Sequence, residues 1–114
     1  MQTVEIPRTS WPKALNEFTT EHQGESISVD ILDSEIGAQP EVQDLPLLGV
    51  SAEPREGHET IIISAEKRSH ESITHIVHNP KRLWIEQRDG GDAVALEIES
   101  PDGKTIVRVR PSTR

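Results

Sequence analysis

The chain of 114 residues has no cysteine, no tyrosine, one phenylalanine and two tryptophans. The absence of cysteine excludes disulfides, thiolate catalysis and cysteine-ligated zinc or iron–sulfur centres. No apolar run approaches the ~20 residues that a membrane-spanning helix needs. Residues 1–7 lack the basic and apolar regions of a signal peptide. We therefore expect a cytoplasmic protein without a membrane partner.

Acidic residues outnumber basic ones by 20 to 12 and give a formal net charge of −8. Because phosphate neutralisation dominates the affinity for nucleic acids, this charge disfavours DNA or RNA as a partner. The charge is also uneven, since residues 1–66 carry 13 acids and 3 bases and residues 67–114 carry 7 acids and 9 bases. The asymmetry favours head-to-tail association or an oppositely charged partner or, more simply, neighbouring strands that neutralise each other in the fold.

Branched aliphatic residues dominate the candidate core. Twelve isoleucines and eight valines outnumber seven leucines, a bias that favours strands over helices. A chain of this length suits one domain with a modest core. We therefore predict a single domain over residues 1–114.

One amphipathic helix is predicted near the N-terminus, over residues 11–22. Ser10 is placed to cap its start, and Pro12 falls in the first turn, where a missing N–H costs little. Gly24 lies where a left-handed C-terminal cap is expected. The apolar stripe at helical spacing consists of Trp11, Leu15, Phe18 and His22.

The C-terminal segment has the pattern of a β-hairpin, with apolar and polar residues alternating on both sides of Asp102-Gly103. A loop of two or four residues sets Ile98 opposite Val107 on the apolar face. The same register pairs Glu97 with Arg108 on the other face.

A second tight turn, at Gly90-Gly91, brings the preceding segment into the same sheet. Its register places Ile85 opposite Leu96 and Leu83 opposite Ile98. Three strands are therefore predicted to share one apolar face: residues 82–88, 93–100 and 104–110.

Further strands are predicted upstream, with less regular patterns. The unbroken run Ile61-Ile62-Ile63 indicates a strand covered on both faces. Gly49 marks a bulge or a close backbone approach within a strand, whereas Pro40 and Pro46 bar a regular central strand from the segment between them. These strands cover residues 27–32, 47–52, 59–65 and 73–78.

These elements predict an α+β protein that is mostly β. One N-terminal amphipathic helix precedes five or six antiparallel strands over residues 26–110. The strands form a small barrel or a strongly bent sheet, and the helix caps an open end or one face. An Sm-like or SH3-like barrel is the closest architecture by analogy.

Histidines are the main candidates for metal ligands or bases. His75 and His78 stand at an odd spacing on one strand, so they point to opposite faces and cannot share a metal without a bulge. A two-histidine site with Glu59 or Glu71 is an alternative to plain surface histidines. The five histidines are His22, His58, His70, His75 and His78.

No combination of nucleophile, base and charge stabiliser emerges from the sequence. The serines lack the G-x-S-x-G pattern, and the glycines lack phosphate-loop spacing. Glu97 and Glu99 share a strand face, which we interpret as solvated. We therefore expect no enzymatic activity and no cofactor.

The most suggestive surface lies on the strand over residues 82–88. Its outer face is predicted to carry Arg82, Trp84 and Arg88, and an exposed tryptophan between arginines anchors protein interfaces or stacks on a base. We assign a candidate partner surface to these three residues. The alternative is that Trp84 packs as ordinary core, under the helix or against residues 36–48.

The chain contains, in order, Ile6-Pro7-Arg8, Trp11-Pro12, Phe18, Ile36-Gly37-Ala38-Gln39, Asp44-Leu45-Pro46-Leu47, Gly49-Val50-Ser51, Thr74-His75, Pro80, Ile85-Glu86-Gln87 and Ala95-Leu96-Glu97-Ile98-Glu99. Together these segments resemble a family of short bacterial proteins catalogued only as a domain of unknown function. The resemblance covers nearly the whole chain. It implies a bacterial, single-domain, cytoplasmic protein, and it assigns no catalytic residues.

The sequence therefore favours a non-enzymatic protein-interaction or assembly module. Its partner is another protein or the chain itself, joined through strand edges or through faces of opposite charge. Residues 36–48, apolar and punctuated by proline and glycine, are a second candidate binding segment, or a lid that completes the core. The alternatives are a small-ligand or metal-binding β-barrel that uses His75 or His78, and single-stranded nucleic-acid binding through the basic strip of residues 81–88.

Overall fold

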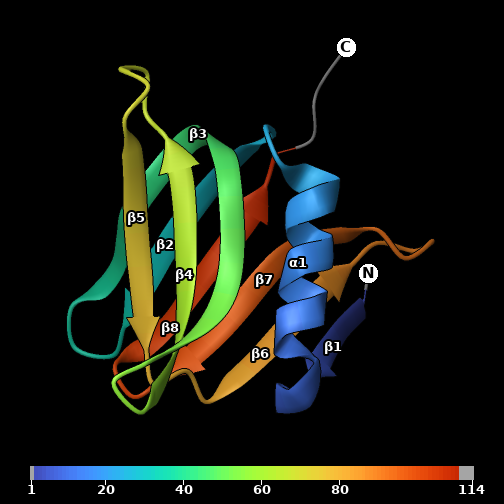
Figure 1. The fold of residues 1–114 in the computed structure, drawn as a ribbon, viewed down its shortest axis with the longest axis vertical. Coiled ribbons are helices and arrows are strands. Elements are labelled where there is room, and N and C mark those ends of the chain that lie inside the picture. The colour runs from blue at the N-terminus through green and yellow to red at the C-terminus, as the bar shows by residue number, and fades with distance from the viewer. Residues whose placement is uncertain (1, 111–114) are drawn as a thin grey trace.

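The computed structural model describes residues 2–110, which form one α-helix, one short 3-10 turn and eight strands (Figure 1). The 3-10 turn, Arg8–Ser10, leads directly into α1 (Trp11–His22). None of the helices in the described part of the chain has the length and apolar character needed to span a bilayer. The strands are β1 (Gln2–Ile6), β2 (Ser26–Asp33), β3 (Gly37–Arg55), β4 (His58–Glu66), β5 (Ser72–His78), β6 (Arg82–Gln87), β7 (Ala93–Ser100) and β8 (Gly103–Val109).

The prediction of a mostly β protein with one N-terminal helix is confirmed. The predicted total of five or six strands was too low, because all seven of the segments predicted individually form strands after the helix and residues 2–6 add β1 before it. All neighbouring strands pair antiparallel, in the order β1-β6-β7-β8-β2-β3-β4-β5. Strands β1 and β5 lie at opposite ends of this order, so the sheet is bent but does not close.

The bend lies within β3, which belongs to both halves of the sheet. Residues up to Pro46 pair with β2, and residues from Leu47 onward pair with β4. Figure 1 shows the result as two layers, with β5, β4, the second half of β3 and α1 standing in front of the other strands. The helix therefore takes the place beside β3 that a further strand would otherwise occupy.

Residues 38–46, from which Pro40 and Pro46 were predicted to bar a regular central strand, form an irregular strand at an edge of the sheet. Pro40 lies opposite Asp30 in the β2–β3 ladder, next to a register shift. The first half of β3 pairs with a neighbour on one side only, so a missing N–H on its free side removes no ladder hydrogen bond. Pro46 stands at the point where β3 changes layers. Gly49, as predicted, lies at a bulge.

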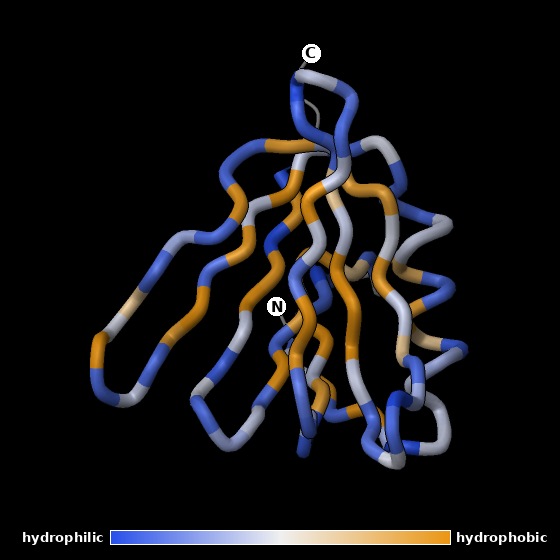
Figure 2. The backbone as a smooth tube through the Cα atoms, turned by 60° about the vertical axis from the view of Figure 1, so that its left-hand side comes forward, coloured by the Kyte–Doolittle hydropathy of each residue, from blue (hydrophilic) through white to orange (hydrophobic). Residues whose placement is uncertain are grey.

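The two layers enclose one cluster of buried apolar side chains. Figure 2 shows hydrophobic residues alternating with hydrophilic ones along the strands, as one buried and one solvated face require. Ile61, Ile62 and Ile63 are all buried, in line with the run predicted to be covered on both faces. The members of the cluster that are less than 2% exposed include Leu15, Ile27, Val29, Leu47, Ile61, Ile63, Leu83, Leu96, Ile98 and Val107.

The predicted register of β6 and β7 is confirmed, with Ile85 opposite Leu96 and Leu83 opposite Ile98. The register of β7 and β8 was predicted wrongly by two residues. Ile98 lies opposite Thr105 rather than Val107, because the turn is formed by Pro101 and Asp102. A shift of two keeps every side chain on its predicted face.

This shift changes the charge pairs on the outer face. Glu97 does not face Arg108 as predicted but contacts the Lys104 ammonium at 3.5 Å. Arg108 instead reaches Asp30 on β2 at 3.1 Å, and Arg110 reaches Asp44 on β3 at 2.9 Å. These two bridges join the acidic first part of the chain to the basic second part. They support the simpler interpretation of the charge asymmetry.

The helix spans the predicted residues and buries Trp11, Leu15 and Phe18 against the sheet. Ser10 occupies the N-cap position, but its side chain makes no capping hydrogen bond, because the preceding 3-10 turn leads into the helix. Gly24 adopts the expected positive φ, of 88°.

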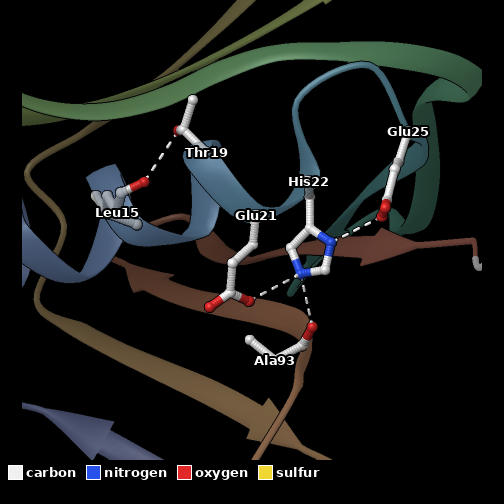
Figure 3. Close-up of polar contacts among 6 residues, drawn as sticks. All are labelled: Leu15, Thr19, Glu21, His22, Glu25 and Ala93. Atoms are coloured by element: carbon white, nitrogen blue, oxygen red, sulfur yellow. Dashed lines mark hydrogen bonds and ion pairs between the residues drawn. The ribbon is translucent and has the colours of Figure 1, made fainter.

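The helix satisfies the backbone of β3 through Thr19. The Thr19 hydroxyl oxygen accepts a hydrogen bond from the Val50 N–H at 2.9 Å and lies 3.1 Å from the Val50 carbonyl oxygen. It also lies 2.9 Å from the Leu15 carbonyl oxygen, the contact that Figure 3 shows. Gly49 lies next to this contact, and an added Cβ there would stand at van der Waals distance, 3.4 Å, from the Thr19 methyl group. The Thr19 side chain thus contacts backbone groups of β3 that a neighbouring strand would otherwise bind.

Replacing Thr19 by Val is expected to lower the free energy of unfolding by about 1–3 kcal/mol, because the Val50 N–H loses its partner in a half-buried position. Thr20→Val is the matched control, since Thr20 is exposed on the same helix and the substitution has the same effect on helix propensity. Chemical denaturation of both variants measures the difference. Equal stabilities would contradict a role for Thr19 in satisfying the β3 backbone.

Candidate interaction surface

Trp84 lies on the outer face of the sheet, as predicted, opposite Glu5 on β1 and Glu97 on β7. It is half-buried and does not belong to the core cluster, so the alternative that it packs as ordinary core was wrong. The Lys104 ammonium stands over its ring, 5.6 Å from the ring centroid, a cation–π contact. The ring is therefore flanked by two carboxylates and covered by a cation of its own chain.

The three residues of the predicted partner surface are not brought together. Arg82 shares the outer face with Trp84 and forms an ion pair with Glu99 at 3.8 Å. Arg88 follows a register shift at the end of β6 and lines a pocket at the C-terminal end of α1. The basic strip is thus divided between two sites. Its arginines and Trp84 all have acidic neighbours, and these carboxylates would repel a phosphate backbone.

The pocket that Arg88 lines has a volume of about 360 Å³, and His22 is among its other lining residues. Figure 3 shows the polar contacts of His22. One ring nitrogen of His22, Nδ1, lies 2.8 Å from a Glu25 carboxylate oxygen, and Nε2 lies 2.8 Å from the Ala93 carbonyl oxygen. Both partners are acceptors, so both contacts are hydrogen bonds only when both ring nitrogens carry a proton. The sequence pattern predicts that His22 lies on the apolar stripe of the helix, but it does not predict the contact between His22 and β7.

His22 therefore acts as a structural tie between the end of α1 and the start of β7. The ring packs against Phe18, with centroids 4.8 Å apart, and its side chain is 13% exposed. Because both nitrogens already have partners, neither is free to bind a ligand or to act as a base.

The variant His22→Leu is expected to lose about 1–3 kcal/mol of stability, because the Ala93 carbonyl loses its donor. His58→Leu is the control, since His58 is an exposed histidine at the first position of β4. Thermal or chemical unfolding of the two variants gives the comparison. A fully stable His22→Leu protein would show that the bridge to β7 is dispensable.

The other histidines are distributed over both faces of β5 and the nearby turns. His75 lies opposite Ile63 on the inner face and His78 lies opposite Thr60 on the outer face, as predicted. His78 lines a pocket with His58, the first residue of β4, and with Glu56. Within residues 2–110 no three histidine or acidic side chains are grouped so as to hold a metal ion.

Burial shifts the titration of His75. Desolvation lowers the pKa of its imidazole below the usual value, the nearby Glu41 carboxylate opposes this shift, and His78 adds to it. Glu41 belongs to the first half of β3, in the opposite layer. The ring of His75 is therefore half-buried between the layers, close to the edge of the molecule.

Residues 36–48 are neither a binding loop nor a lid, because most of them are strand. Val42 and Leu47 are buried in the core cluster. Ile36 lies in the turn between β2 and β3 and is 69% exposed, the most exposed large apolar residue among those described. The segment therefore completes the core from within the sheet, while Ile36 and, to a lesser degree, Leu48 are exposed.

Besides the half of β3 that α1 covers, three sheet edges within residues 2–110 lack a neighbouring strand. Two of them carry features that hinder pairing. Strand β1 has five residues, includes Glu5 and is followed by Pro7. The first half of β3 has Pro40, two register shifts and the positive φ of Asp44. Short length, proline, charge and bulges are the features by which natural sheets protect their edges.

The third edge, β5, carries none of these features. Its seven residues, Ser72–His78, pair with β4 without a register shift. They contain no proline, no glycine and no aspartate, glutamate, lysine or arginine. An edge of this kind presents unpaired backbone N–H and C=O groups to an incoming strand. No local pattern in the sequence indicates this edge, because an edge is defined by the order of strands in the sheet.

Comparisons with known proteins agree with the resemblance seen in the sequence. An uncharacterized protein of Aquifex aeolicus (strain VF5) is 27% identical over 112 residues, which cover 98% of this chain and 96% of that protein. No solved structure matches the chain at a significant level. Residues 2–114 match the family described as "Family of unknown function (DUF5335)". The chain therefore belongs to this family.

Proposed function

We propose that this protein is a non-enzymatic interaction module that binds an extended segment of a partner protein along β5. The observation that carries the proposal is the free, regular and uncharged edge of Ser72–His78. An added strand would gain main-chain hydrogen bonds from this edge, and the alternating side chains of β5 would select its residues. A cytoplasmic location belongs to the same proposal.

The side chains along β5 define which partner fits. Ile73 and Val77 face the core side, whereas Thr74 is exposed on the outer side, next to the Ser64 hydroxyl at 3.3 Å. A complementary strand would carry aliphatic residues at alternate positions on the inner side and small polar or β-branched residues on the outer side. Acidic side chains on the inner side would have to be buried beside isoleucine and valine, which is costly.

The Trp84 surface offers less for a partner. The Lys104 ammonium lies over the ring, and Arg82 and Lys104 each pair with a glutamate. None of the large apolar side chains that are exposed in the described chain lies next to Trp84 on the outer face. Interface hot spots are anchored by aromatic residues that a partner desolvates. At Trp84 this would require displacing a cation that the fold already provides.

The experiment selects peptides on the immobilised full chain from a phage-displayed library of random heptapeptides. The wild-type chain is expected to enrich peptides with alternating β-branched residues. Thr74→Lys is expected to weaken their binding on the order of tenfold, because an edge lysine hinders strand addition. Biolayer interferometry with the selected peptides measures the change.

The matched control is Thr3→Lys, which places the same side chain at an exposed position on the opposite edge strand, β1. It is expected to bind the selected peptides as the wild type does. Both positions are exposed, so both variants should fold, and circular dichroism checks this. Peptides that bind Thr74→Lys and the wild type equally well would refute strand addition at β5.

A further inference from the structure

We infer that the strand that pairs with β5 is β5 of a second copy, so that two chains join antiparallel about a two-fold axis through His75 and separate in acid. This inference rests on the proposed function and names the partner and the regulation of the same edge. The two sheets would continue across the axis into one.

The residues of β5 are arranged to pair with themselves. With His75 on the axis, Ile73 of one copy lies opposite Val77 of the other, and this aliphatic pair occurs twice on the inner face. On the outer face Thr74 lies opposite Ile76, again twice. The end residues, Ser72 and His78, complete the seven pairs. Each pair joins residues of compatible size and polarity, and none joins two carboxylates or two amines.

The charge distribution supports the same partner. Two chains of net charge −8 repel each other in general, so self-association needs a seam without carboxylates. Strand β5 supplies that seam, because all 20 acidic residues lie outside it. At physiological ionic strength, charges farther than about 8 Å from the seam are largely screened. A single seven-residue seam is short, so we expect a dimer in rapid exchange with monomers rather than a permanent one.

His75 makes this seam sensitive to pH. On the axis the two imidazoles would lie opposite each other, with Cβ atoms about 5 Å apart, and a second chain would bury them further. The titratable groups that act on each ring are Glu41 on β3, which favours the charged form, and His78 on β5, which opposes it. Protonation of both rings would place like charges side by side in a poorly solvated position.

The sign of the pH effect follows from proton binding. The paired state holds the two imidazoles neutral, whereas separated chains leave each ring freer to take up a proton. Two monomers therefore bind more protons than one dimer, and lowering the pH favours dissociation. The effect lies at and below the usual pKa of histidine, about 6.5, because burial already lowers the pKa of His75 in the single chain.

The test is sedimentation equilibrium of the full chain at about pH 8 and about pH 5.5, on either side of the usual histidine pKa. The wild type is expected to dimerise at the higher pH, with a dissociation constant that rises on the order of tenfold at the lower pH. Far-ultraviolet circular dichroism at both pH values distinguishes dissociation from unfolding. Thr74→Lys is expected to be monomeric at both, and Thr3→Lys to behave as the wild type.

Two histidine variants assign the pH dependence. His75→Gln keeps a polar side chain of similar size but removes the charge change, so its dimer should be equally strong at both pH values. His78→Gln should retain the wild-type dependence, because His78 faces Ser72 rather than another histidine across the axis. A dependence that follows His78, or that persists in His75→Gln, would overturn the two-fold axis at His75.

Two results separate this inference from the proposed function. A wild type that stays monomeric at about pH 8 and millimolar concentration, yet selects β5-binding peptides, overturns the second copy as partner and leaves strand addition standing. A dimer that Thr74→Lys does not weaken overturns the β5 seam as the dimer contact. Failure of both the peptide selection and dimerisation refutes both proposals.

Discussion

The structure depends on one strand, β3, which provides the edge of one layer and then of the other. Its first half pairs with β2 and its second half with β4, so the two layers are held together covalently as well as by their core. Pro46 and the bulge at Gly49 occupy the stretch where the strand changes partner. Because the second half of β3 has a strand on only one side, its other side needs a different partner for its backbone. Helix α1 takes that position, and the Thr19 hydroxyl and the Gln23 amide contact backbone groups of β3 there.

This arrangement explains why the chain can be acidic and still compact. The core is built from side chains that alternate along the strands, and the charges remain on the outer faces. There, cations of the second part of the chain meet carboxylates of the first, as in the contacts of Arg108 with Asp30 and of Arg110 with Asp44. Exposed pairs of this kind add little to stability individually. Their consequence is that cations at the end of the chain lie beside carboxylates of β2 and β3, so part of the uneven charge of the sequence is neutralised within the fold.

The sequence predicted most of the secondary structure because each element carries a local pattern. The helix has a stripe ending in His22 and a glycine after it. The apolar alternation on either side of Gly90-Gly91 fits one register, which the structure keeps up to the shift after Glu86. The β7–β8 register was missed by two residues because Pro101-Asp102 and Asp102-Gly103 are both plausible turns, and both keep the apolar side chains on the same face. Pro40 was correctly taken to bar a central strand, but the edge strand that contains it was not predicted, since the cost of proline in a strand depends on whether that side of the strand has a neighbour. Whether a strand has a neighbour on a given side cannot be predicted from its own residues.

The candidate site was the least predictable part for the same reason. Arg88 was expected beside Trp84, but a register shift at the end of β6 moves it toward the helix. The residues of β5 alternate like those of any strand, and only the strand order of the whole sheet places them at an edge. Once that position is known, their composition becomes informative. Thr74 is exposed, so a lysine in its place would cost the core nothing and would protect the edge, as Glu5 and the following Pro7 protect β1. An edge that is easily protected and is nevertheless left uncharged along its whole length is suited to pairing.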